Sequence, residues 1–125
     1  MEVINIYRPK DKNSLFIDQR GVIADVLYNT QVQHITYIES RPYVLRGNHY
    51  HKETTQVTLI LEGRTNYWSQ DIMFDISARM QILTSGDMVV APPYHAHTFL
   101  SSEEGCKMMV FTNGIRGGVD YEKDT

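Results

Sequence analysis

The chain has 125 residues, a formal net charge of −3 at pH 7 and one cysteine. This length predicts one domain that can enclose a core without disulfides or a structural metal. The excess of acidic residues disfavours nucleic acids and anionic membranes as partners. Cys106 is the only cysteine, so it cannot form an intrachain disulfide. The sequence shows neither a signal peptide nor an apolar run long enough to span a membrane. We therefore expect a cytoplasmic protein.

Short strands separated by turns make up most of the chain, and no segment shows sustained helical periodicity. In chain order, the expected strands are 3–7, 22–27, 33–40, 45–51, 56–62, 64–69, 74–83, 87–91, 97–100 and 106–112. Many strands at roughly ten-residue spacing predict an all-β sandwich or barrel. The polar tail 117–125 is expected to be frayed or ordered only by a partner.

Two histidine clusters carry the chemistry that the sequence suggests. His49 and His51 lie two positions apart, so in an extended strand both imidazoles project from one face, and Gln56 could join them from the next strand. The second cluster contains His95 and His97, and the sequence leaves open which of these two faces a pocket. Three histidines at such spacings favour one shared pocket over unrelated structural positions.

The spacing of these residues forms two motifs. They read His49-x-His51, Gln56 and Gly63, and then Gly86, Pro92 and His97. The pair resembles the two sequence motifs of the cupin superfamily. That resemblance implies a single all-β domain over residues 1–125, a double-stranded β-helix (jelly-roll barrel) with its core at about 15–113 and a pocket inside the barrel. It also implies a homodimer.

Further motifs resemble the sugar-nucleotide branch of the cupins, which contains the dTDP-4-dehydrorhamnose 3,5-epimerases and the dTDP-4-oxo-6-deoxyglucose 3,4-ketoisomerases. Asp18 to Gly21 is similar to the D-x-R-G of the epimerases, and Arg46 to Tyr50 is similar to their R-G-x-H-[FY]. The ketoisomerase pattern is matched more widely, at Tyr37-Ile38, Arg46 to Lys52, Gln56 to Gly63 and Met108 to Val110.

This resemblance implies an isomerase or epimerase that acts on a nucleotide-linked 4-keto-6-deoxysugar in deoxysugar or polysaccharide biosynthesis and needs no cofactor. The reaction would remove the proton next to the keto group and pass through an enediolate. The resemblance assigns His49 as the base, His51 as a proton carrier and Tyr37 as a donor to the developing oxyanion. The implied substrate-binding residues are Arg46, Gln56, His97, Arg20 and Lys52.

Two other functions stay open at this stage. His49, His51 and His97, with Gln56 in the position of the usual carboxylate, could hold one divalent transition metal in an oxygenase or a metal-assisted isomerase, although a neutral amide would hold a dication less firmly. A cupin that binds a sugar without converting it is the other alternative.

Overall fold

The computed structural model describes residues 3–74 and 77–114. Within these ranges the chain is built of β-strands and one short 3₁₀ helix, which confirms the predicted all-β class. The elements are β1 (Ile4–Asn5), η1 (Lys12–Ser14), β2 (Leu15–Asp18), β3 (Gly21–Ala24), β4 (His34–Ser40), β5 (Leu45–His49), β6 (Gln56–Asp71), β7 (Arg79–Thr84), β8 (Asp87–Ala91) and β9 (His95–Thr112).

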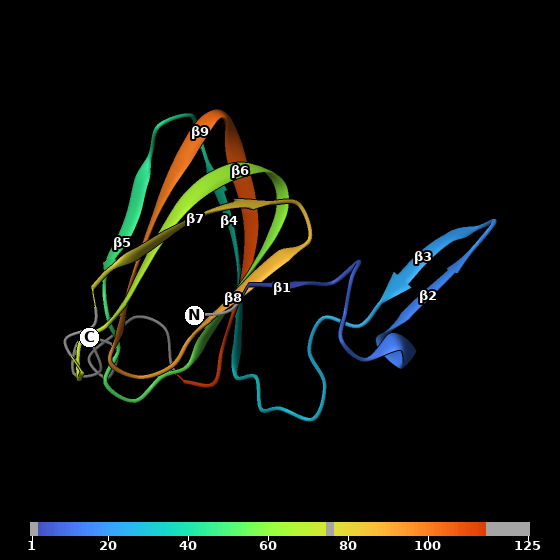
Figure 1. Cartoon of the computed structure of the whole chain (residues 1–125), viewed down its shortest axis with the longest axis horizontal. Coiled ribbons are helices and arrows are strands. Elements are labelled where there is room, and N and C mark those ends of the chain that lie inside the picture. The colour runs from blue at the N-terminus through green and yellow to red at the C-terminus, as the bar shows by residue number, and fades with distance from the viewer. Residues whose placement is uncertain (1–2, 75–76, 115–125) are drawn as a thin grey trace.

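Two long antiparallel strands, β6 and β9, run side by side, and each forms part of both walls of a barrel (Figure 1). The first half of β6 and the second half of β9 belong to a first sheet, in the order β1-β8-β6-β9-β4. Their other halves, where β7 pairs with β6 and β5 pairs with β9, continue the same seven-stranded sheet beyond the bends and form the opposite wall, which we call the second sheet. Strand β8 has the predicted bounds, 87–91.

Glycines allow β6 and β9 to bend from one sheet into the other. Gly63 and Gly105 have φ angles of +86° and +74°, and the register of β6 shifts around Gly63. A Cβ on Gly63 would lie 2.2 Å from the carbonyl oxygen of Gly105, so glycine is required for this close approach. The strands predicted at 56–62 and 64–69 are therefore one bent strand, and 97–100 and 106–112 are likewise parts of β9.

The core lies between the two sheets. It consists of Ile60, Tyr67, Leu83, Val89, Phe99, Cys106, Met108 and Val110. These side chains alternate with outward-facing ones along their strands, as expected for strands that contribute one face to a core. Cys106 is buried as a free thiol, and burial raises its pKa to about 11, which favours an unreactive neutral thiol.

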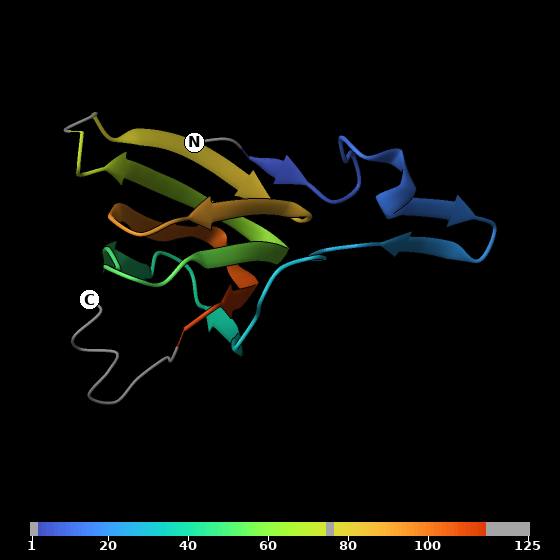
Figure 2. The ribbon, with the colours of Figure 1, turned by 90° about the horizontal axis from the view of Figure 1, so that it is seen from below.

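Strands β2 and β3 form a separate two-stranded sheet that projects away from the barrel (Figures 1 and 2). We call residues 15–24 the arm. Strand β2 is absent from the sequence prediction. The arm lies within the range 15–113 expected for the barrel core but forms its own sheet, and an apolar, strand-forming run does not reveal which sheet it joins. The expected strands 3–7 and 74–83 are also shorter, at β1 and β7.

Residues 75–76 and the tail 117–125 lie outside the described residues. In the part of the chain that is described, no helix has the length and apolar character needed to cross a membrane.

Candidate active site

Three histidines meet between the two sheets. His49 in β5 and His97 in β9 are cross-strand partners, and their ring centroids lie 4.6 Å apart. The ring of His51 lies 5.0 Å from that of His49 and 5.5 Å from that of His97. His51 and His97 are each only 2% exposed. The structure thus brings together the residues that the sequence groups by spacing alone.

The backbone before His49 is irregular in a way that positions its side chain. Gly47 has a φ of +86° and Asn48 one of +60°, and the register between β5 and β9 shifts between Gly47 and His49. A Cβ on Gly47 would lie 2.7 Å from the carbonyl oxygen of His97. This β-bulge re-aims the end of β5 and allows His49 to face His97.

The orientation of His97 is set by a backbone carbonyl. Its Nδ1 lies 3.3 Å from the carbonyl oxygen of His95, which can only accept a hydrogen bond. In the neutral imidazole the proton is therefore assigned to Nδ1, and Nε2 is the nitrogen that can accept a proton. His95 itself lies 3.5 Å from the carboxylate of Asp71 and does not line the cavity, so His97 is the pocket histidine of this cluster.

His49 and His97 border a cavity of about 230 Å³, and His51, whose ring lies close to both of theirs, is not among its lining residues. Its walls are formed by Ile38, Leu45, Arg46, Gly47, His49, Gln56, His97, Phe99, Met108 and Val110. Arg46 is held by two donated hydrogen bonds, from Nε to Ser40 Oγ (2.7 Å) and from a terminal nitrogen to the carbonyl oxygen of Glu39 (3.1 Å). The cavity therefore combines imidazoles, a fixed guanidinium and a buried amide with apolar walls.

Tyr37, the expected donor to the oxyanion, is not among the residues that line this cavity. In β4, Ile38 faces the cavity, so its neighbour Tyr37 points to the outer face of the sheet. The Tyr37 hydroxyl donates to Glu39 Oε1 at 2.6 Å, and this hydrogen bond to a carboxylate raises the pKa of Tyr37.

Arg20 and Lys52 also lie outside the walls of the cavity. Arg20 follows β2 at the tip of the arm and forms an ion pair with Asp18 at 2.6 Å, which lowers the pKa of that carboxyl. Lys52 is exposed in the bend after His51. Conversely, the sequence did not identify Ser40 as the partner of Arg46, because that contact depends on how β4 and β5 are arranged.

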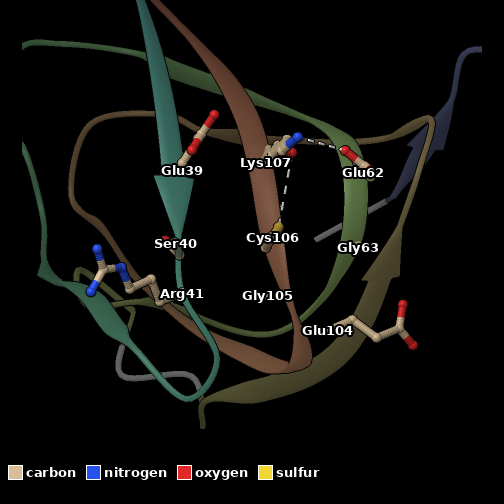
Figure 3. Close-up of a pocket in the computed structure, with 9 residues that line it drawn as sticks. All are labelled: Glu39, Ser40, Arg41, Glu62, Gly63, Glu104, Gly105, Cys106 and Lys107. Carbon is tan, nitrogen blue, oxygen red and sulfur yellow. Dashed lines mark hydrogen bonds and ion pairs between the residues drawn. The ribbon is translucent and has the colours of Figure 1, made fainter.

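A larger cavity of about 410 Å³ lies at the bends of β6 and β9 (Figure 3). Carboxylates and cations line it, and Lys107 forms a 3.0 Å ion pair with Glu62 that raises the pKa of the lysine. No histidine is among its lining residues. Its lining residues do not include an imidazole, the side chain whose ordinary pKa suits proton transfer near neutral pH, so we do not place the chemistry there.

The barrel has the cupin-type jelly-roll fold, and His49 and His97 line the cavity between its two sheets. The chain belongs to the polysaccharide biosynthesis C-terminal domain family, whose sequence profile matches residues 16–116. No curated protein sequence is significantly similar to the chain.

Solved structures of sugar-nucleotide enzymes share the fold. A 3,4-ketoisomerase from Helicobacter canadensis is 19% identical, with a TM-score of 0.73 over 93% of this chain and 84% of that one. The 3,4-ketoisomerase QdtA from Thermoanaerobacterium thermosaccharolyticum, in complex with TDP, is 17% identical, with a TM-score of 0.74 over 98% and 84%. A dTDP-4-dehydrorhamnose 3,5-epimerase from Sulfolobus tokodaii is 22% identical, with a TM-score of 0.70 over 83% and 68%.

Proposed function

We propose that the protein is an isomerase or epimerase of a nucleotide-linked 4-keto-6-deoxysugar. The observation that carries the proposal is the gathering of His49, His51 and His97, of which His49 and His97 line a cavity together with Arg46. Imidazoles suit proton transfer at neutral pH, and a fixed guanidinium suits a phosphate or a sugar oxygen. The similar ketoisomerase and epimerase structures support this choice of substrate class.

In the proposed reaction, His49 takes the proton from the carbon next to the ketone. The electrons of that C–H bond form the enediolate, and reprotonation of a carbon of the enediol completes the isomerisation or epimerisation. His51 is the proposed proton carrier, since its ring is close to those of both His49 and His97. Arg46 and Gln56 can donate to the developing oxyanion from the cavity wall, a task that was expected of Tyr37. No cofactor takes part.

The test is to incubate the protein with dTDP-4-keto-6-deoxyglucose in deuterated water and follow the sugar by NMR. We expect deuterium to enter at the carbon next to the ketone and a new keto-sugar or epimer to form. Binding without exchange or conversion, across a panel of keto-sugar nucleotides, would reject the enzyme and favour the sugar-binding alternative.

A metal-dependent cupin is the second candidate, since one ring nitrogen from each of His49, His51 and His97 lies within 4.8 Å of the others. We propose these residues, with Gln56, as the ligands in that case. A divalent transition ion would supply Lewis-acid polarisation of a substrate oxygen. Elemental mass spectrometry of untagged protein, grown with abundant Fe, Mn, Ni and Zn and purified without chelators, tests this candidate. About one ion per chain would support it, and none would reject it.

We further propose that the protein is a cytoplasmic homodimer. The compartment is inferred from Cys106, a buried free thiol in a chain without a disulfide. The dimer is inferred from large apolar side chains that one copy leaves exposed, among them Phe16, Ile17 and Ile35.

A further inference from the structure

One turn, residues 92–95, contacts two of the three histidines of the candidate active site. The backbone nitrogen of Tyr94 donates to the carbonyl oxygen of His51 at 2.7 Å. The carbonyl oxygen of His95 lies 3.3 Å from Nδ1 of His97. The position of this turn therefore bears both on the loop that carries His51 and on the nitrogen of His97 that holds the proton.

The backbone of the turn is held in an unfavourable conformation. Tyr94 has a φ of +63°, in the left-handed region that a bulky side chain rarely adopts. Its carbonyl oxygen accepts a hydrogen bond from the backbone nitrogen of Ile72 at 3.1 Å, and its ring is stacked with that of Tyr50 at a centroid distance of 5.9 Å. Such a conformation persists only where the surrounding structure holds it, and it is most often found beside functional groups.

Asp71, the last residue of β6, holds the end of the turn through the side chain of His95. The two residues are cross-strand partners, and Asp71 Oδ2 lies 3.5 Å from His95 Nε2. The other ring nitrogen of His95, Nδ1, lies 3.2 Å from the carbonyl oxygen of Pro93. The carboxylate is itself fixed, because its Oδ1 accepts from the backbone nitrogen of Met73 at 3.1 Å. The imidazole of His95 is thus held at both nitrogens, between β6 and the turn.

We propose that Asp71 and His95 are positioning residues for His97. Neither lines the cavity, so both act through the backbone. Asp71 fixes the ring of His95, and His95 in turn presents the carbonyl oxygen that keeps a proton on Nδ1 of His97 and leaves Nε2 to accept one. The other tautomer would present a donor where the reaction needs an acceptor, an error that lowers catalysis in other histidine sites. The effect on turnover rests on the proposed function, but the tautomer can be observed without a substrate.

The first test observes the ring of His97 by NMR. Two-bond ¹⁵N–¹H correlation spectra distinguish the two neutral tautomers, and the chain has five histidines, so the signals of His97 are assigned by their loss in His97→Gln. We expect the Nδ1–H tautomer in the wild type and a mixture with the Nε2–H tautomer in Asp71→Asn. In that variant the amide oxygen stays on the backbone nitrogen of Met73, and the NH₂ group faces His95. An unchanged His97 tautomer in Asp71→Asn would overturn the inference.

The second test compares kcat with KM for a keto-sugar nucleotide. Asp71→Asn should lower kcat about tenfold or more, because small displacements of a reacting group are costly. Its KM should stay within about twofold, since Asp71 does not line the cavity.

Asp87→Asn is the matched control for these measurements. Asp87 also accepts two hydrogen bonds, from Asn5 Nδ2 and from the backbone nitrogen of Thr84, each at 2.9 Å, and it lies at the far end of β8 from the turn. This variant should unfold at a lower temperature but keep the kcat and the His97 tautomer of the wild type. Equal losses of kcat in Asp71→Asn and Asp87→Asn would point to general destabilisation and overturn the inference.

A double-substitution cycle tests whether Asp71 acts through His95. His95→Leu keeps the backbone carbonyl but removes the ring that Asp71 holds. If the two residues form one unit, the double variant Asp71→Asn/His95→Leu should lower kcat no further than the more harmful single variant. Effects that multiply would reject the link. A wild type that converts no keto-sugar nucleotide would count against the proposed chemistry alone, and the tautomer of His97 would then decide the inference.

Discussion

His49 and His97 face each other directly across β5 and β9, with their rings edge to face at an interplanar angle of 82°. Each histidine comes from a different sequence motif, and each lines the same cavity. The contact joins the two motifs into one site, so substitutions at either strand should affect chemistry more than folding.

Replacement of His49 by asparagine is expected to lower turnover of the keto-sugar nucleotide by about 10²- to 10⁴-fold, the usual contribution of a general base. Asparagine is polar and of similar size, so thermal unfolding and dTDP binding should stay close to those of the wild type. Loss of deuterium exchange in NMR would locate the defect at proton abstraction. Full activity in this variant would disprove the proposed role.

Arg46→Lys should raise KM about tenfold and change kcat less. Lysine keeps the charge but cannot reproduce the planar fork that reaches both Ser40 and Glu39. Ser40→Ala is the matched control, because it removes one anchor and retains the guanidinium, so its KM should lie between those of the wild type and Arg46→Lys. Steady-state kinetics check both variants, and an unchanged KM in Arg46→Lys would exclude Arg46 from substrate binding.

Tyr37→Phe should keep turnover within about twofold of the wild-type value, because surface substitutions away from a site usually have small effects. The change removes the hydroxyl that donates to Glu39 on the outer face of the first sheet and leaves the aromatic ring in place. A large fall in kcat, with normal dTDP binding, would show that the hydroxyl acts on the substrate after all.

Gly63→Ala should destabilise the protein by about 3 kcal/mol or more, because the new methyl group would meet the carbonyl oxygen of Gly105 at a positive φ. Gly21→Ala is the comparison: Gly21 also has a positive φ, but a methyl group there would meet no heavy atom within 4 Å. The free energy of unfolding of that variant should fall by roughly 1 kcal/mol. Urea unfolding measures both, and equal losses would mean that the bend tolerates a side chain.

The buried thiol of Cys106 predicts a dependence of stability on alkaline pH. Folding raises its pKa from the ordinary value of 9.0 to about 11. The stabilisation that this pKa difference gives to the folded protein is complete below pH 9. It is lost as the pH rises towards 11, because the unfolded chain releases the thiol proton first. Between pH 8 and pH 11, the free energy of unfolding measured with urea should therefore fall less in Cys106→Ala than in the wild type, by up to about 2 kcal/mol. Identical losses in both proteins would contradict this assignment.

Local patterns in the sequence determined the all-β class, the bounds of β8 and the grouping of His49, His51 and His97. Alternation with a period of two and fixed motif spacings depend on nearby residues, so they can be read without knowledge of the fold. Gly63 and Gly105 were also visible as special positions, but each was predicted to separate two strands.

Only the tertiary structure decided which residues share a surface. A shift of one residue exchanges the two faces of a strand, and the structure places Ile38 in the cavity and Tyr37 outside it. The bends at Gly63 and Gly105 depend on the approach of β6 to β9, and the separation of the arm depends on strands that do not pair with it. These features arise from contacts between distant parts of the chain, which no local pattern specifies.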